Sequence, residues 1–226
     1  MRHRLRAGAA VYNVGHRHAA HDLWEDRWLD LRERLVEAGD DPPATAEAAT
    51  PVDDPPVPST AADERLLHGL IQFTAAAHHR AEGNADGARD LGESAGVYLG
   101  ALPDEYRDCA LAPVRKWLDA LADDADAAPR PPPLRHEGTV VTLVDLDAES
   151  ALLAAPVVAE TTGYDPEPVA AAAEYARETV RADETSRFVA LVVDFVTGDR
   201  RGVVYRRLSD HVDRRRRRDR DVDGLF

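Results

Sequence analysis

Apolar residues recur at helical spacing along most of the chain. The clearest apolar face follows an i, i+4, i+7, i+11 pattern and consists of Trp24, Trp28, Leu31 and Leu35. This spacing predicts a helix of about five turns that buries one side against a neighbour. A wider apolar arc runs from Leu66 to Ala77, in a second helix that we expect to begin at Asp63-Glu64 and to end at Gly83-Asn84.

Further helices are predicted downstream. A third apolar face consists of Leu91, Ala95, Tyr98 and Leu102. Pro113 marks the start of a fourth helix, because proline suits the first helical position. Asp165-Pro166 pairs a capping residue with proline in the same way, and it opens an alanine-rich helix that reaches about Val180. The last helix begins near Val203.

Two segments leave strand structure open. Residues 139–144 form a short β-branched run, which is too short to be stable alone. The run from Phe188 to Val196 has helical spacing, although its many β-branched residues would also suit a strand. The overall pattern predicts an all-α protein built from antiparallel helical hairpins, with at most one short strand near 139–144.

Proline-rich segments divide the chain. The first, at 40–60, predicts an extended loop between two helices, and the second, at 127–137, predicts a stiff linker. We therefore expect a helical domain at 1–126 and a helical C-terminal extension at 138–226.

Two turns share the form Gly-Asx-x-x-Gly-small. They begin at Gly83-Asn84 and Gly198-Asp199, and each lies between an apolar helix and an amphipathic one. Both are predicted to be helical-hairpin turns in which the first glycine adopts the left-handed conformation and the second permits close packing. The similarity could come from an internal duplication or from independent use of the same turn chemistry.

The charge balance indicates a habitat more than a function. Asp and Glu total 42 against 28 basic residues, and Lys116 is the only lysine. A net charge of −14 is typical of a halophile, where salt screens the repulsion between carboxylates; an arginine-rich acidic protein from a GC-rich genome is the alternative. Nucleic acid is not expected as a partner, because phosphate contacts weaken steeply with salt.

The remaining composition predicts a cytoplasmic protein that is neither exported nor membrane-inserted. Cys109 is the only cysteine, so no intramolecular disulfide can form. No apolar run approaches the ~20 residues that span a bilayer. Aspartates flank the run of five arginines from Arg214 to Arg218 on both sides, and we expect a solvated helix end there.

Histidines and carboxylates at two helix faces are the candidate chemistry. His18, His21 and Glu25 are predicted on one side of the first long helix, and His68, Gln72 and His79 on one face of the second, opposite Leu70. One hypothesis is that His21, Glu25 and either His78 or His79 converge on a divalent metal ion. The alternative is that His21 and Glu25 form a structural hydrogen bond while the second-helix face is solvated. No known catalytic signature is present.

Several motifs together resemble the domain of unknown function 309 family. They are Tyr12-Asn13-x-Gly15, Ala20-His21-Asp22-x-x-Glu25-x-x-Trp28, Leu67-x-Gly69-Leu70-Ile71-Gln72, His79 and Gly83-Asn84-x-x-Gly87-Ala88. The resemblance covers roughly residues 5 to 105. The chain departs from the family pattern at Asp22, where Glu is usual, at His18, where an aromatic is common, and in its proline-rich insertion.

The resemblance implies a small all-helical protein without an established activity. If the family has a functional cluster, the matching positions are His21, Glu25, Trp28, Gln72 and His79. We expect a non-catalytic module that binds a protein or a small molecule, because paired helices with Gly-Asx turns resemble tetratricopeptide-type packing. The alternative is a metal-dependent hydrolase with His21, Glu25 and His79 as metal ligands and a divalent metal as its cofactor.

Overall fold

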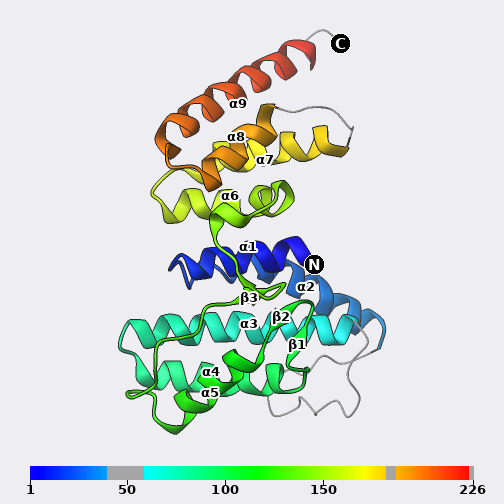
Figure 1. Ribbon diagram of the computed structural model, residues 1–226. Helices are drawn as coiled ribbons and strands as arrows, with labels where there is room; N and C mark the ends of the chain where they lie inside the picture. The colour runs from blue at the N-terminus through cyan, green and yellow to red at the C-terminus, as the bar shows by residue number, and fades with distance from the viewer. Residues whose placement is uncertain (40–58, 182–186, 224–226) are drawn as a thin grey trace. The chain divides into compact units, whose positions relative to one another are not determined.

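The computed structural model describes residues 1–39, 59–181 and 187–223, and the chain divides into two compact units (Figure 1). Met1–Val141 contains α1 (Arg2–Asn13), α2 (Asp22–Glu37), α3 (Thr60–Ala81), α4 (Ala85–Gly100), β1 (Glu105–Tyr106), β2 (Cys109–Ala110), α5 (Ala112–Asp123), β3 (Arg135–His136) and β4 (Thr139–Val140). Thr142–Phe226 contains the 3-10 turn η2 (Leu143–Asp145), α6 (Ala148–Thr161), α7 (Pro166–Arg181), α8 (Arg187–Thr197) and α9 (Arg201–Asp223). Helices dominate the described residues, so the all-α class is confirmed.

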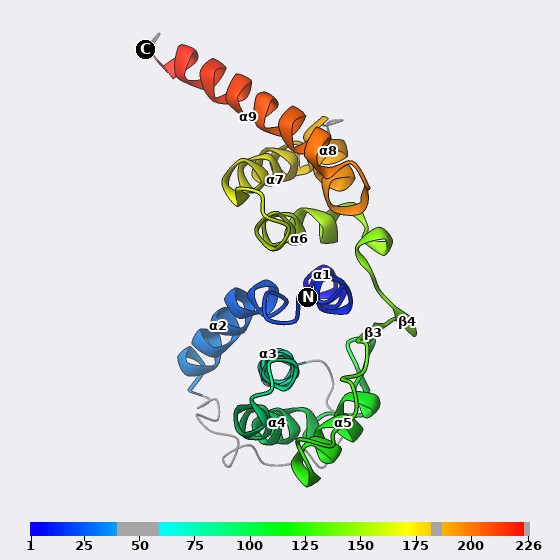
Figure 2. The ribbon, with the colours of Figure 1, turned by 90° about the vertical axis from the view of Figure 1, so that its left-hand side faces the viewer.

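Helix α3 is the centre of the first unit. Figure 2 shows it end-on, with α1 and α2 on one side and α4 and α5 on the other. Its packing against α4 is close because Gly69 has no side chain: a Cβ there would lie 2.6 Å from the Leu99 side chain. Glycine at position 69 therefore permits the close approach of the two helices.

Helix α2 packs on α3 and α1 through the predicted apolar face. Trp24, Leu31 and Leu35 are buried, whereas Trp28 is only half-buried. The Trp24 indole lies against Gly8 of α1, and its Nε1 donates a hydrogen bond to the Arg4 carbonyl at 3.0 Å. Residues 40–58 of the predicted proline-rich loop lie outside the described residues, and Ser59 then caps α3 by accepting a hydrogen bond from the Ala62 amide.

The two Gly-Asx turns differ in structure. Gly83 has a φ of +76° and ends α3 as predicted, and the Asn84 side chain caps α4 by accepting from the Gly87 amide. Gly198 does not adopt a left-handed φ, so the prediction for that turn was wrong. A Cβ at Gly198 would lie 2.5 Å from the Asp194 carbonyl oxygen, which is a sufficient steric reason for glycine there.

The described residues include a small antiparallel sheet in the order β1-β2-β3-β4. The expectation of at most one strand therefore undercounted them, although β4 does begin at Thr139, where that strand was predicted. Each strand has only two residues, which is too short to produce a period-2 hydrophobic pattern.

The proline-rich segment predicted as a linker at 127–137 belongs to the first unit instead. Trp117 Nε1 donates to the Pro129 carbonyl at 2.8 Å, and the Tyr12 hydroxyl donates to the Pro132 carbonyl at 3.1 Å. The Asn13 side chain also bonds both the amide and the carbonyl of Leu134. These hydrogen bonds attach the segment to α1 and α5, so the division between units follows Val141.

In the second unit, α7 and α8 lie between α6 and α9 (Figure 1). The helical interpretation of residues 188–196 is confirmed, because α8 buries Val192, Phe195 and Val196 on one side. Helix α7 begins at Pro166 as predicted, and α9 carries the five-arginine run. Among the described residues, no helix has both the length and the apolar character needed to cross a membrane.

His136 of β3 is a fully buried titratable group. Neither ring nitrogen forms a hydrogen bond with a described residue, and Nδ1 lies 3.9 Å from Glu137 Oε2. Burial lowers the pKa of His136, despite the opposing effect of Glu137. The charge of Glu137 is already engaged by Arg2 and Arg6, at 2.8 Å each, so it is a poor partner for an imidazolium.

Replacing Gly8 by alanine is expected to destabilise the protein. The added Cβ would overlap the buried Trp24 indole, and overpacking of this kind typically costs about 1–3 kcal/mol. Gly96→Ala in α4 is the matched control: a Cβ there meets nothing within 4 Å, and we expect a gain of about 0.5–1 kcal/mol. Urea unfolding of both variants tests the contrast, and equal effects would show that Gly8 is not a packing position.

Stability should fall in mild acid because of His136. Its pKa is lower in the folded chain than the ~6.5 of an unfolded one, so below about pH 6.5 the unfolded state binds a proton that the folded state does not. The resulting destabilisation is absent above about pH 6.5. It grows by at most ~1.4 kcal/mol per pH unit as the pH falls toward the pKa of His136 in the folded chain. His136→Leu should have a flatter unfolding free energy between about pH 7 and pH 5. Identical pH profiles for the variant and the wild type would contradict this assignment.

Candidate functional site

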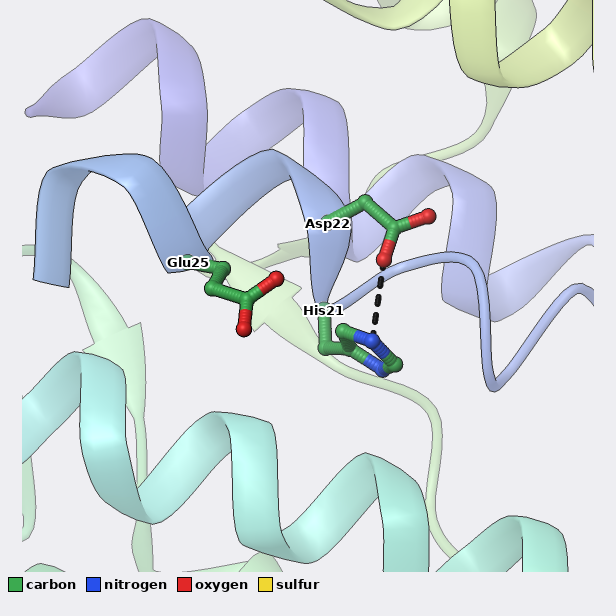
Figure 3. A group of neighbouring side chains, drawn as sticks. All are labelled: His21, Asp22 and Glu25. Atoms are coloured by element: carbon green, nitrogen blue, oxygen red, sulfur yellow. Dashed lines mark ion pairs between the residues drawn. The ribbon is translucent and has the colours of Figure 1, made fainter. Parts of the chain in front are cut away.

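Three potential ligands converge at the start of α2. His21 precedes the helix, and Asp22 and Glu25 lie in its first turn. Each residue offers one ligand atom, and these atoms all lie within 4.8 Å of one another. Figure 3 shows the Glu25 carboxylate turned toward the His21–Asp22 pair, in which His21 Nε2 is 2.9 Å from Asp22 Oδ1.

The local sequence explains this convergence. A helix N-terminus carries partial positive charge, which favours acidic residues in the first turn. Asp22 and Glu25 are three residues apart and therefore lie on neighbouring positions of one helix face. His21 comes directly before them, and its side chain is largely buried, with 19% exposed, whereas Asp22 and Glu25 are exposed. The result is a largely buried imidazole beside two solvent-accessible carboxylates.

A row of histidine rings continues from this group to α3. The ring centroids of His18 and His21 are 4.5 Å apart, those of His18 and His78 are 5.2 Å apart, and those of His78 and His79 are 6.0 Å apart. His18 was predicted on the helix with His21, but it lies in the turn that precedes α2. The turn places His18 between α2 and His78 of α3.

His79 has a different neighbour. Its Nδ1 lies 2.9 Å from the side-chain nitrogen of Asn84, the residue that caps α4. The described residues that bring ligand atoms together are His21, Asp22 and Glu25, so the third member of the group is Asp22 and not His79. Both carboxylates come from one helical turn, which makes the cluster more local than the predicted set of His21, Glu25 and His79.

Trp28 belongs to a separate network around a buried carboxylate. Its Nε1 donates to Glu64 Oε1 at 2.8 Å, and Arg32 Nη1 donates to the same oxygen at 3.3 Å. His68 Nδ1 is also 3.3 Å from that oxygen. Burial by itself would raise the pKa of Glu64, but the contacts of His68 and Trp28 outweigh it, so the pKa is lowered and the carboxylate is ionised at neutral pH.

His68 was expected on a solvated face, and that prediction was wrong. The residue is buried, and its ring stacks on Tyr98 of α4 with centroids 3.9 Å apart. The face opposite Leu70 is covered because both α2 and α4 pack on α3. Gln72, one turn further along α3, is half-buried and makes no hydrogen bond with the residues that the structure describes.

The five residues carried over from the family resemblance thus separate into several environments. His21 and Glu25 lie together at the start of α2, Trp28 contacts Glu64, and His79 contacts Asn84 at the α3–α4 turn. Sequence reasoning missed Asp22 as a ligand, although it adjoins His21 in the same motif. It also missed Glu64, because a carboxylate at a helix start is usually solvated.

The arrangement at α2 is suited to a divalent cation. One imidazole nitrogen and two carboxylate oxygens are donors that Zn²⁺ and other divalent first-row metals accept. Exposure of both carboxylates leaves room for water molecules or a further ligand at the ion. His18 is the nearest additional imidazole, through its ring contact with His21.

Comparisons with known proteins do not assign this site. A scan against protein-family models found no match, and a search of curated proteins found no significant relative. The resemblance to the domain of unknown function 309 family therefore stays a prediction, and any function for the His21–Asp22–Glu25 group must be argued from its geometry.

Proposed function

We propose that the first unit is a non-catalytic binding module that holds a divalent transition-metal ion at His21, Asp22 and Glu25. The observation that carries this proposal is the approach of their three ligand atoms to within 4.8 Å. Side chains at that spacing can close around an ion without movement of the backbone, since metal–ligand bonds are about 2.0–2.2 Å long.

Electrostatics favours a cation at this position. Asp22 and Glu25 are like charges one helical turn apart, and such pairs destabilise a helix slightly. His21 is the neighbouring group that offsets this repulsion, through its contact with Asp22 at 2.9 Å. A divalent ion would neutralise both carboxylates at once, and it would bind the neutral form of the imidazole.

A metal-dependent hydrolase is the second candidate. It is supported by the exposure of Asp22 and Glu25, because catalytic zinc sites keep a coordination position open for water. The exposed His18 ring beside His21 is the group that would accept a proton from such a water. The binding module is favoured because it requires only the three metal ligands, whereas the hydrolase also requires a bound water and a group that accepts its proton.

Two broader inferences accompany this proposal. Membership of the domain of unknown function 309 family is supported by the packing of its two motif-bearing helices, α2 and α3, which contact each other through Trp28 and Glu64. A cytoplasm of high salt is supported by the excess of 42 acidic over 28 basic residues.

Metal binding is tested by calorimetric titration of metal-free full-length protein with Zn²⁺ and with Mn²⁺. Wild type should bind one ion, and His21→Ala and Glu25→Gln should each weaken binding at least about tenfold, because a ligand is lost. His79→Gln should bind like wild type, since His79 contacts Asn84 instead. Absence of binding to wild type, or an equal loss in His79→Gln, would refute the site.

The same metal-loaded protein separates the two candidate functions. The binding module predicts stoichiometric metal without hydrolysis of model esters or phosphodiesters. Hydrolysis that depends on the metal and is lost in His18→Gln, while the ion stays bound, would favour the hydrolase.

A further inference from the structure

A cavity of about 330 Å³ in the first unit is lined, among the described residues, by charged groups of only one sign. It lies between the turn that precedes α2, the C-terminal end of α3 and the proline-rich segment that follows α5. Arg17, Arg80 and Arg130 line it, and none of its described lining residues is a carboxylate. Two larger cavities in the second unit differ, because aspartates such as Asp213 and Asp199 accompany their arginines.

The three arginines are unusual in this acidic chain. None of them forms an ion pair with a carboxylate among the described residues, although the chain has 42 acidic residues against 28 basic ones. Elsewhere arginines do have acidic partners: Arg107 pairs with Asp63, and Arg216 pairs with Glu167. Three guanidinium groups without acidic partners around one cavity create a local positive potential in a molecule of net charge −14.

Hydrogen bonds hold one of these side chains in place, and two of the three keep N–H donors available. Arg80 Nη2 donates to the Asp126 carbonyl at 2.7 Å and to the Ala128 carbonyl at 3.4 Å, while Arg80 Nε has no partner in the described part of the chain. The Arg17 guanidinium lies near the Tyr12 hydroxyl and opposes the rise in the Tyr12 pKa that burial causes. A guanidinium has five N–H donors, so both groups can still bind an anion.

The third arginine, Arg130, lies in the proline-rich segment that forms one rigid wall of the cavity. Arg130 stands between Pro129 and Pro131, whose rings fix the backbone φ angle. The carbonyls of Pro129 and Pro132 accept hydrogen bonds from Trp117 and Tyr12, so the wall is attached to the helices on both sides of Arg130. Such preorganisation lowers the entropic cost of ligand binding.

We propose that this cavity binds a small molecule that carries a phosphate or carboxylate group. The guanidinium groups contact the anion, since their planar N–H pairs match both oxyanions bidentately. Ala81 and the proline rings provide apolar surface for a short uncharged part of the ligand. The volume is at the lower end of the ~300–1,000 Å³ typical of small-molecule sites, so the bound group is small.

Titration calorimetry with phenyl phosphate, benzoate and the neutral benzyl alcohol tests the proposal. Metal is first removed from the full-length protein with EDTA, and the EDTA is then dialysed away because it is itself a polycarboxylate. The outcome therefore does not depend on the proposed metal site. Wild type should bind at least one of the two anions saturably and benzyl alcohol much more weakly, and the tighter anion identifies the preferred group. Arg130→Gln should weaken anion binding about tenfold, as expected for loss of one charge-assisted contact.

Arg34→Gln is the matched control, because it removes the same charge from an exposed position on α2. It should leave anion binding unchanged, and both variants should melt like wild type because neither side chain is buried. No saturable binding of either anion, equal affinity for benzyl alcohol, or an equal loss in Arg34→Gln would overturn the proposal. Loss of metal binding in His21→Ala with retained anion binding would show that the two sites are independent.

Discussion

Two consecutive buried carboxylates at the start of α3 constrain the first unit more than any other feature. Asp63 accepts two hydrogen bonds from the Arg107 guanidinium, at 2.8 and 2.7 Å, and one from the Tyr106 hydroxyl. Glu64 is held from the other side by Trp28 and Arg32 of α2. Desolvation of a charge costs several kcal/mol unless it is paired, so both the β1–β2 hairpin and α2 must be in place when α3 is buried.

This constraint also sets the position of the candidate sites. Trp28 of α2 contacts Glu64 near the N-terminal end of α3, whereas His18, just before α2, contacts His78 near the other end. Helix α2 is therefore antiparallel to α3. Glu64 and His78 are 14 positions apart on α3, or about 21 Å along the helix, which separates the buried carboxylates from the histidine row and the arginine-lined cavity. Structural charge pairs and candidate binding groups thus occupy opposite ends of one helix.

The segment between α1 and α2 contributes to both proposed sites. It supplies Arg17 to the cavity and His18 and His21 to the histidine row. Gly15 has a φ of +103°, which lets the chain reverse direction directly after α1. A connecting segment held by two packed helices is a common location for binding residues, because the scaffold fixes its ends while its side chains remain accessible.

Local sequence information was sufficient for the helices but not for their environments. The apolar faces, the Asn84 cap and the proline at the start of α7 depend on residues within one or two turns, so periodicity and capping chemistry predicted them. The same information placed His21 and Glu25 on neighbouring positions of one turn. It could not show that Glu64 and His68 are buried, because their cover comes from other helices.

The remaining features depend on contacts between residues far apart in the chain. Asp63 meets Arg107 across 44 positions, and Asn13 bonds Leu134 across 121. Such contacts produce no hydrophobic periodicity in the sequence. The proline-rich segment was therefore predicted to be a linker, and the two-residue strands were not recognised. The arginine-lined cavity has the same origin, since Arg17, Arg80 and Arg130 belong to three separate segments. Helix faces are a property of local chain geometry, whereas the partner of each face is decided only when the whole unit packs.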